Sequence, residues 1–210
     1  MTRLAGCLLL ALCLPGWAGA SPAASLARAY DALRQGQAAE AARLYRDLAE
    51  QGVPEAQFNL ALLYFDGQGL PQNHAETLYW AWRARLSGRG EAMALLARTA
   101  DLATPDLRAT LAERLAADLQ PRIEAGEGRA MLELAGVYLE VQPEPDPVQG
   151  FVWQALAAAL GVPGAGAARD LTAAALPAED RLKAEAAAAE QLATLCAKAL
   201  KGSALCEAVP

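Results

Sequence analysis

The sequence predicts an all-α protein, a right-handed α-solenoid of about five antiparallel helix pairs. The chain of 210 residues is 54% hydrophobic but only 6% aromatic, a composition that suits closely packed helices. Ala56, Ala92, Ala130 and Ala165 recur at intervals in the mid-thirties, the length of one helix pair with its turns. No segment alternates polar and apolar residues as a strand does. A single pair cannot bury its own apolar stripe, so neighbouring pairs are expected to stack.

The first helices follow from apolar spacing and from the residues that end them. In residues 23–35, Leu26, Tyr30 and Leu33 share one face, and Gly36 ends the helix. Asn73 is a suitable cap for a later helix in the same half. The next expected helices cover residues 38–51, 55–65 and 73–87.

The second half of the chain continues the pattern with less regular helices. Pro105 opens a long helix at a position where proline is tolerated. Pro121 lies inside that helix and is expected to kink or restart it. Asp146 is the expected cap of a later helix. The expected helices cover residues 90–100, 105–124, 126–140, 147–160, 165–175 and 177–201.

Two segments repeat the same order of small residues, aromatics and glycines. In residues 52–88 the repeated positions are Gly52, Ala56, Leu60, Tyr64, Gly67, Gly69, Asn73, Ala75, Trp80 and Gly88. In residues 126–161 they are Gly126, Ala130, Leu134, Tyr138, Asp146, Trp153 and Gly161. The second copy lacks both loop glycines and one residue of loop length, so its loop is expected to have a different shape.

At these positions the chain resembles the Sel-like repeat family, a branch of the tetratricopeptide superfamily, as an exported bacterial member. Asn73 stands where the family pattern has aspartate. The resemblance covers residues 38–90 and 126–165. It implies a scaffold or adaptor that brings proteins together, often in envelope or signalling complexes. Some secreted members are cysteine-rich, and this chain departs from that subgroup.

Residues 1–20 have the pattern of a cleaved signal peptide, which leaves residues 21–210 as the repeat domain. Arg3 precedes an apolar run at residues 8–14, and Ala18 and Ala20 supply the small residues of a cleavage site before Ser21. The apolar run is too short to cross a bilayer as a helix, so no transmembrane anchor is expected. The expected location is periplasmic or secreted.

Cleavage would leave two cysteines, Cys196 and Cys206. Cysteines of an exported protein can pair in an oxidising compartment, and the alternative is two unpaired small apolar side chains. Two thiols and the distant His74 do not complete a zinc shell. No metal and no cofactor are expected.

An aromatic cluster suggests a binding surface. Trp80 and Trp153 are expected to fill the core between helices. Trp82 points to a different helix face from Trp80 and is a candidate binding anchor. Tyr79 and Arg83 lie one turn apart and are expected to flank the same surface.

These observations favour a non-enzymatic interaction scaffold in the bacterial cell envelope, whose partner is an unidentified protein or peptide. A net charge of −6 disfavours nucleic acid as a partner. One alternative is a cell-wall-active enzyme of the penicillin-binding or β-lactamase type. None of the four serines beyond residue 20 (Ser21, Ser25, Ser87 and Ser203) has the lysine three residues on that such an enzyme needs. Another alternative is a structural protein that self-associates.

Overall fold

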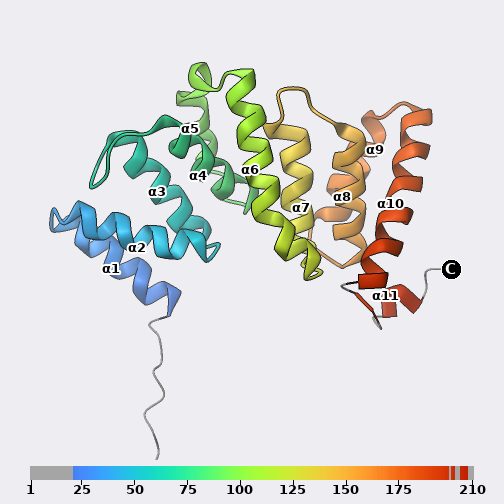
Figure 1. Cartoon of the computed structure of the whole chain (residues 1–210), viewed down its shortest axis with the longest axis horizontal. Helices are drawn as coiled ribbons and strands as arrows, with labels where there is room; N and C mark the ends of the chain where they lie inside the picture. Colours follow the sequence, from blue (N-terminus) through green and yellow to red (C-terminus); the bar gives the residue numbers. More distant parts are fainter. Residues whose placement is uncertain (1–20, 199, 202–203, 208–210) are drawn as a thin grey trace, which may run out of the picture.

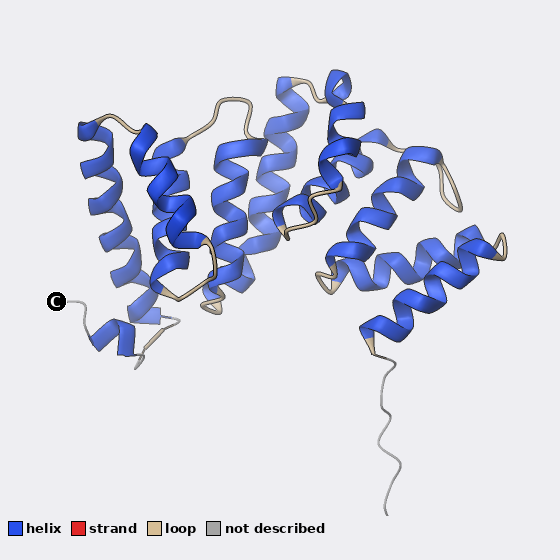
Figure 2. Ribbon diagram, turned by 180° about the vertical axis from the view of Figure 1, so that it is seen from behind, coloured by secondary structure: helices blue, strands red, loops and turns tan. Residues whose placement is uncertain are grey.

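The computed structural model describes residues 21–198, 200–201 and 204–207, and these form an elongated array of helices (Figure 1). No strand occurs in these ranges (Figure 2). The predicted signal peptide, residues 1–20, lies outside the described residues. The elements are α1 (Pro22–Arg34), α2 (Ala38–Glu50), α3 (Pro54–Asp66), α4 (His74–Leu86), α5 (Ala92–Arg98), η1 (Ala100–Leu102), α6 (Pro105–Glu124), α7 (Gly128–Gly136), η2 (Val137–Val141), α8 (Pro147–Ala159), α9 (Ala165–Ala175), α10 (Ala178–Lys198) and α11 (Ala204–Glu207).

The helices stack in sequence order, which confirms the predicted all-α solenoid. α1 packs on α2, α3 on α4, and α7 on α8, and successive pairs meet through α2–α3, α4–α5, α6–α7 and α8–α9. Two later helices depart from simple pairing. α6 packs on α4 as well as on α7, and α10 packs chiefly on α8. α5 is only 7 residues long, so α4 and α6 meet directly beside it.

One continuous apolar core runs from Ala29 in α1 to Leu195 in α10. Much of it is alanine, whose small side chain lets neighbouring helices approach closely. Five of the repeated positions are buried as expected: Ala56, Leu60, Trp80, Ala130 and Leu134. Trp153 was also expected to fill the core, but it is only partly buried against it. The two repeat copies therefore place their tryptophans in different surroundings.

Most predicted helix ends are confirmed within one or two residues. Asn73 caps α4 by accepting the backbone N–H of Glu76 at 3.1 Å. Asp146 caps α8 by accepting the N–H of Gln149 at 2.9 Å. Side-chain caps of this kind satisfy backbone donors that a helix leaves unpaired.

Two expectations about helix continuity need correction. α6 runs without a break from Pro105 to Glu124, so Pro121 does not restart it. Pro121 lies in the final turn, where little helix remains to be disrupted. The last long helix ends at Lys198 rather than at residue 201, and the short α11 follows it.

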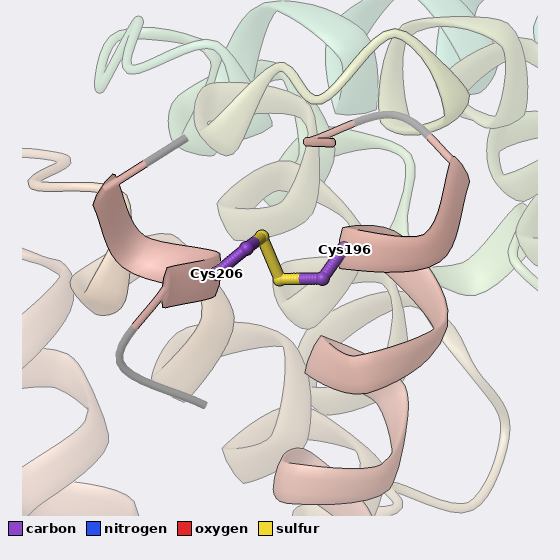
Figure 3. Close-up of a disulfide and its surroundings, with 2 residues drawn as sticks. All are labelled: Cys196 and Cys206. Carbon is purple, nitrogen blue, oxygen red and sulfur yellow. A yellow bond between two sulfur atoms is a disulfide. The ribbon is translucent and has the colours of Figure 1, made fainter. Parts of the chain in front are cut away.

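A disulfide joins Cys196 in α10 to Cys206 in α11 (Figure 3). Their Cα atoms lie 5.5 Å apart, within the usual range for such a bond. The bridge fastens α11 to the last turn of α10, so the predicted pairing is confirmed.

The shorter loop of the second repeat is accommodated by a wider helical turn. In the first copy Gly67 caps the end of α3 with a φ of +66°, and Asn73 N–H donates to Tyr64 O at 3.0 Å. In the second copy α7 continues into the π-helical η2. Asp146 N–H then donates to Tyr138 O at 2.9 Å, the corresponding hydrogen bond. The expected difference in loop shape is confirmed.

Arg108 of α6 completes this altered turn. Its guanidinium donates to the carbonyl oxygens of Glu140 (3.1 Å), Val141 (3.0 Å) and Gln142 (2.6 Å). No glycine ends η2, so these carbonyls receive their donors from a neighbouring helix instead.

Gly69 has both a left-handed conformation and a close neighbour. Its φ is +74°, and a Cβ placed there would lie 2.2 Å from the carbonyl oxygen of Ala38. Gly161 has nearly the same φ, +75°, with nothing within 4 Å. The two glycines therefore differ in packing while they share the backbone constraint.

We predict that Gly69→Ala destabilises the protein more than Gly161→Ala. Gly161→Ala should cost about 1–2 kcal/mol, from the left-handed conformation alone. Gly69→Ala should cost at least about 1 kcal/mol more, because the loop must move away from α2. Urea unfolding followed by circular dichroism measures both, and equal losses would contradict the predicted contact.

Candidate functional site

A groove of about 480 Å³ lies in the middle of the array and is called the central groove here. It is bounded by the α2–α3 turn, the ends of α4 and α6 and the start of α7. Its lining residues are Glu50, Gln51, Gly52, Pro54, Arg83, Ser87, Arg122, Glu127, Arg129 and Glu133.

Equivalent turns of the two repeat copies both reach the central groove, through Gly52 and through Glu127. Gly52 turns the chain into α3 with a φ of +84°, and Gly126 turns it into α7 with a φ of +80°. Both values favour glycine, since a Cβ disfavours the left-handed region. The repeat pattern thus brings the same kind of turn to the groove twice.

The wall contributed by α7 contains a buried carboxylate. The Glu133 side chain is 7% exposed, and Arg122 donates to it at 2.9 Å. Arg129 lies 3.6 Å from the same carboxylate, and Arg122 also pairs with Glu127 at 2.9 Å. Burial by itself would lower the pKa of Arg122, but the charges of Glu133 and Glu127 outweigh it and raise that pKa. The arginines are therefore held in fixed positions in the wall.

The wall contributed by α4 is held by an aromatic and polar network. Tyr79 donates to a carboxylate oxygen of Asp118 and accepts from Arg83 at 3.1 Å. Burial and the hydrogen bond to Asp118 raise the pKa of the Tyr79 hydroxyl. The Arg114 guanidinium of α6 lies 3.4 Å from the centre of the Tyr79 ring. This network joins α4 to α6.

The expected binding surface of Tyr79, Trp82 and Arg83 is only partly assembled. Tyr79 is 3% exposed, so its ring contributes to packing rather than to the surface, which corrects its expected position. Arg83 lines the central groove. Trp82 is partly buried and faces a separate pocket of about 200 Å³ beside Leu96. The roles of Trp82 and Arg83 in binding remain predictions.

A second groove lies on the other side of the last turns of α6. Its volume is about 550 Å³, and it is called the Trp153 groove here. It is lined by Gln120, Ile123, Glu124, Trp153, Gln191, Thr194, Leu195 and Lys198. Sequence reasoning missed this groove, because α10 belongs to a degenerate pair and carries no repeat motif.

The described ranges 21–198, 200–201 and 204–207 contain no metal cluster and no membrane-spanning helix. Within these ranges no three or more histidine, cysteine, aspartate or glutamate side chains are placed to hold a metal ion. In the same part of the chain no helix combines the length and apolar character needed to cross a bilayer. His74, the single histidine, packs near Phe65 with ring centres 6.0 Å apart.

We predict that Arg122→Ala lowers the free energy of unfolding by about 1–3 kcal/mol, because it removes the closest partner of a buried carboxylate. Glu133→Gln in the same background should restore part of the loss, since the buried group is then neutral. Arg43→Ala is the matched control, because Arg43 forms only exposed ion pairs and should cost below about 1 kcal/mol. Equal effects of Arg122→Ala and Arg43→Ala in chemical unfolding would contradict this reading of Glu133.

Comparison with known proteins gives a small set of similar structures. No protein-family model matches the chain, and no curated protein matches it. A protective antigen present in uropathogenic Escherichia coli strains, described as displaying an SLR fold, is 22% identical with a TM-score of 0.35. The match covers 84% of this chain and 46% of that one, so this chain spans less than half of that protein. A Sel1 repeat protein from Oxalobacter formigenes is 25% identical with a TM-score of 0.30, covering 66% of this chain and 73% of that one. The structures similar to this chain thus include proteins described by the repeat type that its sequence resembles.

Proposed function

We propose that this chain is a non-enzymatic interaction module that holds a protein partner at the central groove. The observation that carries the proposal is an open groove of about 480 Å³ formed by equivalent turns of two repeats. Helices from both halves of the array contribute to it. A partner bound there would contact surfaces that only the folded array brings together.

The groove is suited to binding because its charged side chains are already ordered. Arg122 and Arg129 each donate a hydrogen bond to another helix or turn. Arg83 donates to Tyr79 of its own helix and pairs with Asp118 of α6 at 3.9 Å. Side chains that are fixed before binding lose less entropy when a partner arrives. Arginine is also among the residues enriched in protein interfaces. The exposed rim residues Gln51 and Glu127 add polar groups that a partner can contact.

The envelope location belongs to the same proposal. The signal-peptide pattern of residues 1–20 supports export. The disulfide between Cys196 and Cys206 supports an oxidising compartment. The sequence has no serine and lysine pair with the spacing of a penicillin-binding enzyme, which favours a scaffold over that alternative.

Site-specific photo-cross-linking in living cells tests the proposal. A photoreactive residue at Gln51 stands on the groove rim, and one at Gln68 stands on an exposed loop outside the groove. We predict one specific adduct with another protein from position 51 and none from position 68. Adding Arg129→Glu should reduce the adduct several-fold, because it reverses a charge in the groove wall.

Identical adducts from positions 51 and 68 would contradict the assignment of the groove. An adduct with the mass of two copies of this chain would instead support the self-associating alternative. Circular dichroism of each variant checks that the array remains folded.

A further inference from the structure

We propose that the Trp153 groove binds a peptide segment of a partner protein that presents a bulky apolar side chain beside a carboxylate. This inference rests on the proposed function, because it specifies the kind of segment that such a module would hold. It concerns a groove separate from the central groove, on the opposite side of α6.

The first repeat copy shows the tryptophan position in a closed form. The indole Nε1–H of Trp80 donates to Glu76 at 3.1 Å. The Arg83 guanidinium lies 5.2 Å from the Trp80 ring, and the Tyr79 ring packs edge-on at 4.9 Å. Trp80 is left 5% exposed. A polar partner, a cation and an aromatic ring together cover this side chain.

The second copy lacks the residues that make these three contacts with the tryptophan. Gln149, Val152 and Leu156 stand where the first copy has Glu76, Tyr79 and Arg83, and Val152 and Leu156 are buried. Within the described ranges the buried Nε1 of Trp153 has no hydrogen-bond partner. Trp153 remains partly exposed and lines a groove of about 550 Å³. The same repeat position is thus closed in one copy and open in the other.

The floor of the Trp153 groove is apolar. Ile123 of α6 and Leu195 of α10 are 2% and 6% exposed and line the groove together with Trp153. Binding pockets typically combine such a floor with a few polar groups that set orientation. A leucine-sized or phenylalanine-sized side chain would displace water from the groove and bury the exposed part of the Trp153 ring.

The rim of the groove carries one charge of each sign, Glu124 and Lys198. Glu124 already accepts a hydrogen bond from Gln120 at 2.8 Å. Lys198 is exposed, and its ammonium group makes no ion pair with any residue that the structure describes. The nearby disulfide at Cys196 holds the end of α10 in place. A ligand carboxylate would therefore find an available cation at this rim.

The unpaired indole N–H of Trp153 indicates a further group on the ligand, a hydrogen-bond acceptor. An indole N–H can only donate, so it requires an oxygen acceptor. Because Nε1 is buried in the present structure, the ring must turn before a backbone carbonyl oxygen of the bound segment can accept this hydrogen bond. Apolar side chain, carbonyl and carboxylate together describe a short peptide segment.

Nuclear magnetic resonance of the tryptophan indole groups tests the inference with two matched probes. The probes are acetyl-Gly-Leu with a free carboxylate and the same dipeptide as its carboxamide. The full chain has four tryptophans, and the Trp153→Phe variant assigns the Trp153 signal by its loss. We predict that the acid probe moves the Trp153 signal in a saturable manner and leaves the Trp80 signal in place. The carboxamide should bind about two- to fivefold more weakly, as expected for loss of an exposed charge pair.

Lys198→Gln provides the matched protein variant. It should reduce the affinity for the acid probe to that for the carboxamide, without changing the affinity for the carboxamide. A Trp153 signal that neither probe moves would overturn the inference. Equal binding of both probes to both proteins would overturn the assignment of the carboxylate to Lys198. A Trp153 signal that shifts with protein concentration alone would assign the groove to a second copy instead.

The outcome can be separated from that of the proposed function. If the proposed function is wrong, position 51 gives no specific adduct, but the probes still shift the Trp153 indole signal. If this inference is wrong, neither probe shifts the Trp153 indole signal, but the adduct from position 51 still forms.

Discussion

The direct contact between α4 and α6 is the interaction on which the rest of the array depends. α5 is too short to separate these helices, so the two halves of the chain meet across them. Arg114 of α6 lies over the Tyr79 ring and donates to Glu76 at 2.5 Å. Glu76 also accepts from Trp80, and Asp118 accepts from Tyr79. Hydrogen bonds to charged groups contribute about 1.5–3 kcal/mol each when well placed, and partial exposure of Arg114 reduces that figure here.

Both grooves depend on the position of this contact. The last turns of α6 separate them, with Arg122 lining the central groove and Ile123 lining the Trp153 groove. The central groove is polar, and its three arginines are paired with carboxylates. The Trp153 groove has an apolar floor and an available cation at its rim. A partner that reached across α6 would contact two surfaces of different chemistry, and the two sites would then reinforce each other.

Local residue patterns predicted most of the fold. Proline, glycine and capping side chains marked helix ends because they act through their own backbone, and Asn73 and Asp146 both cap as expected. The burial of Tyr79 was not predicted, because its cover comes from Arg114 and Asp118 on a different helix. The π-helical turn of η2 was also missed. It depends on Arg108, which is distant in sequence from the carbonyls it holds. The Trp153 groove was missed because α10, which forms it together with α6 and α8, belongs to a degenerate pair without the repeat motif.

Native-state hydrogen exchange tests the central claim that the α4–α6 contact makes the array one cooperative unit. In the unaltered protein, the slowest amides of α3, α4, α7 and α8 should share one opening free energy. In Arg114→Ala the slowest amides of α3 and α4 should open at a free energy about 1–2 kcal/mol below those of α7 and α8. Different opening free energies for the two halves of the unaltered protein would contradict a single cooperative unit. An equal decrease of the opening free energy in both halves of Arg114→Ala would also contradict it.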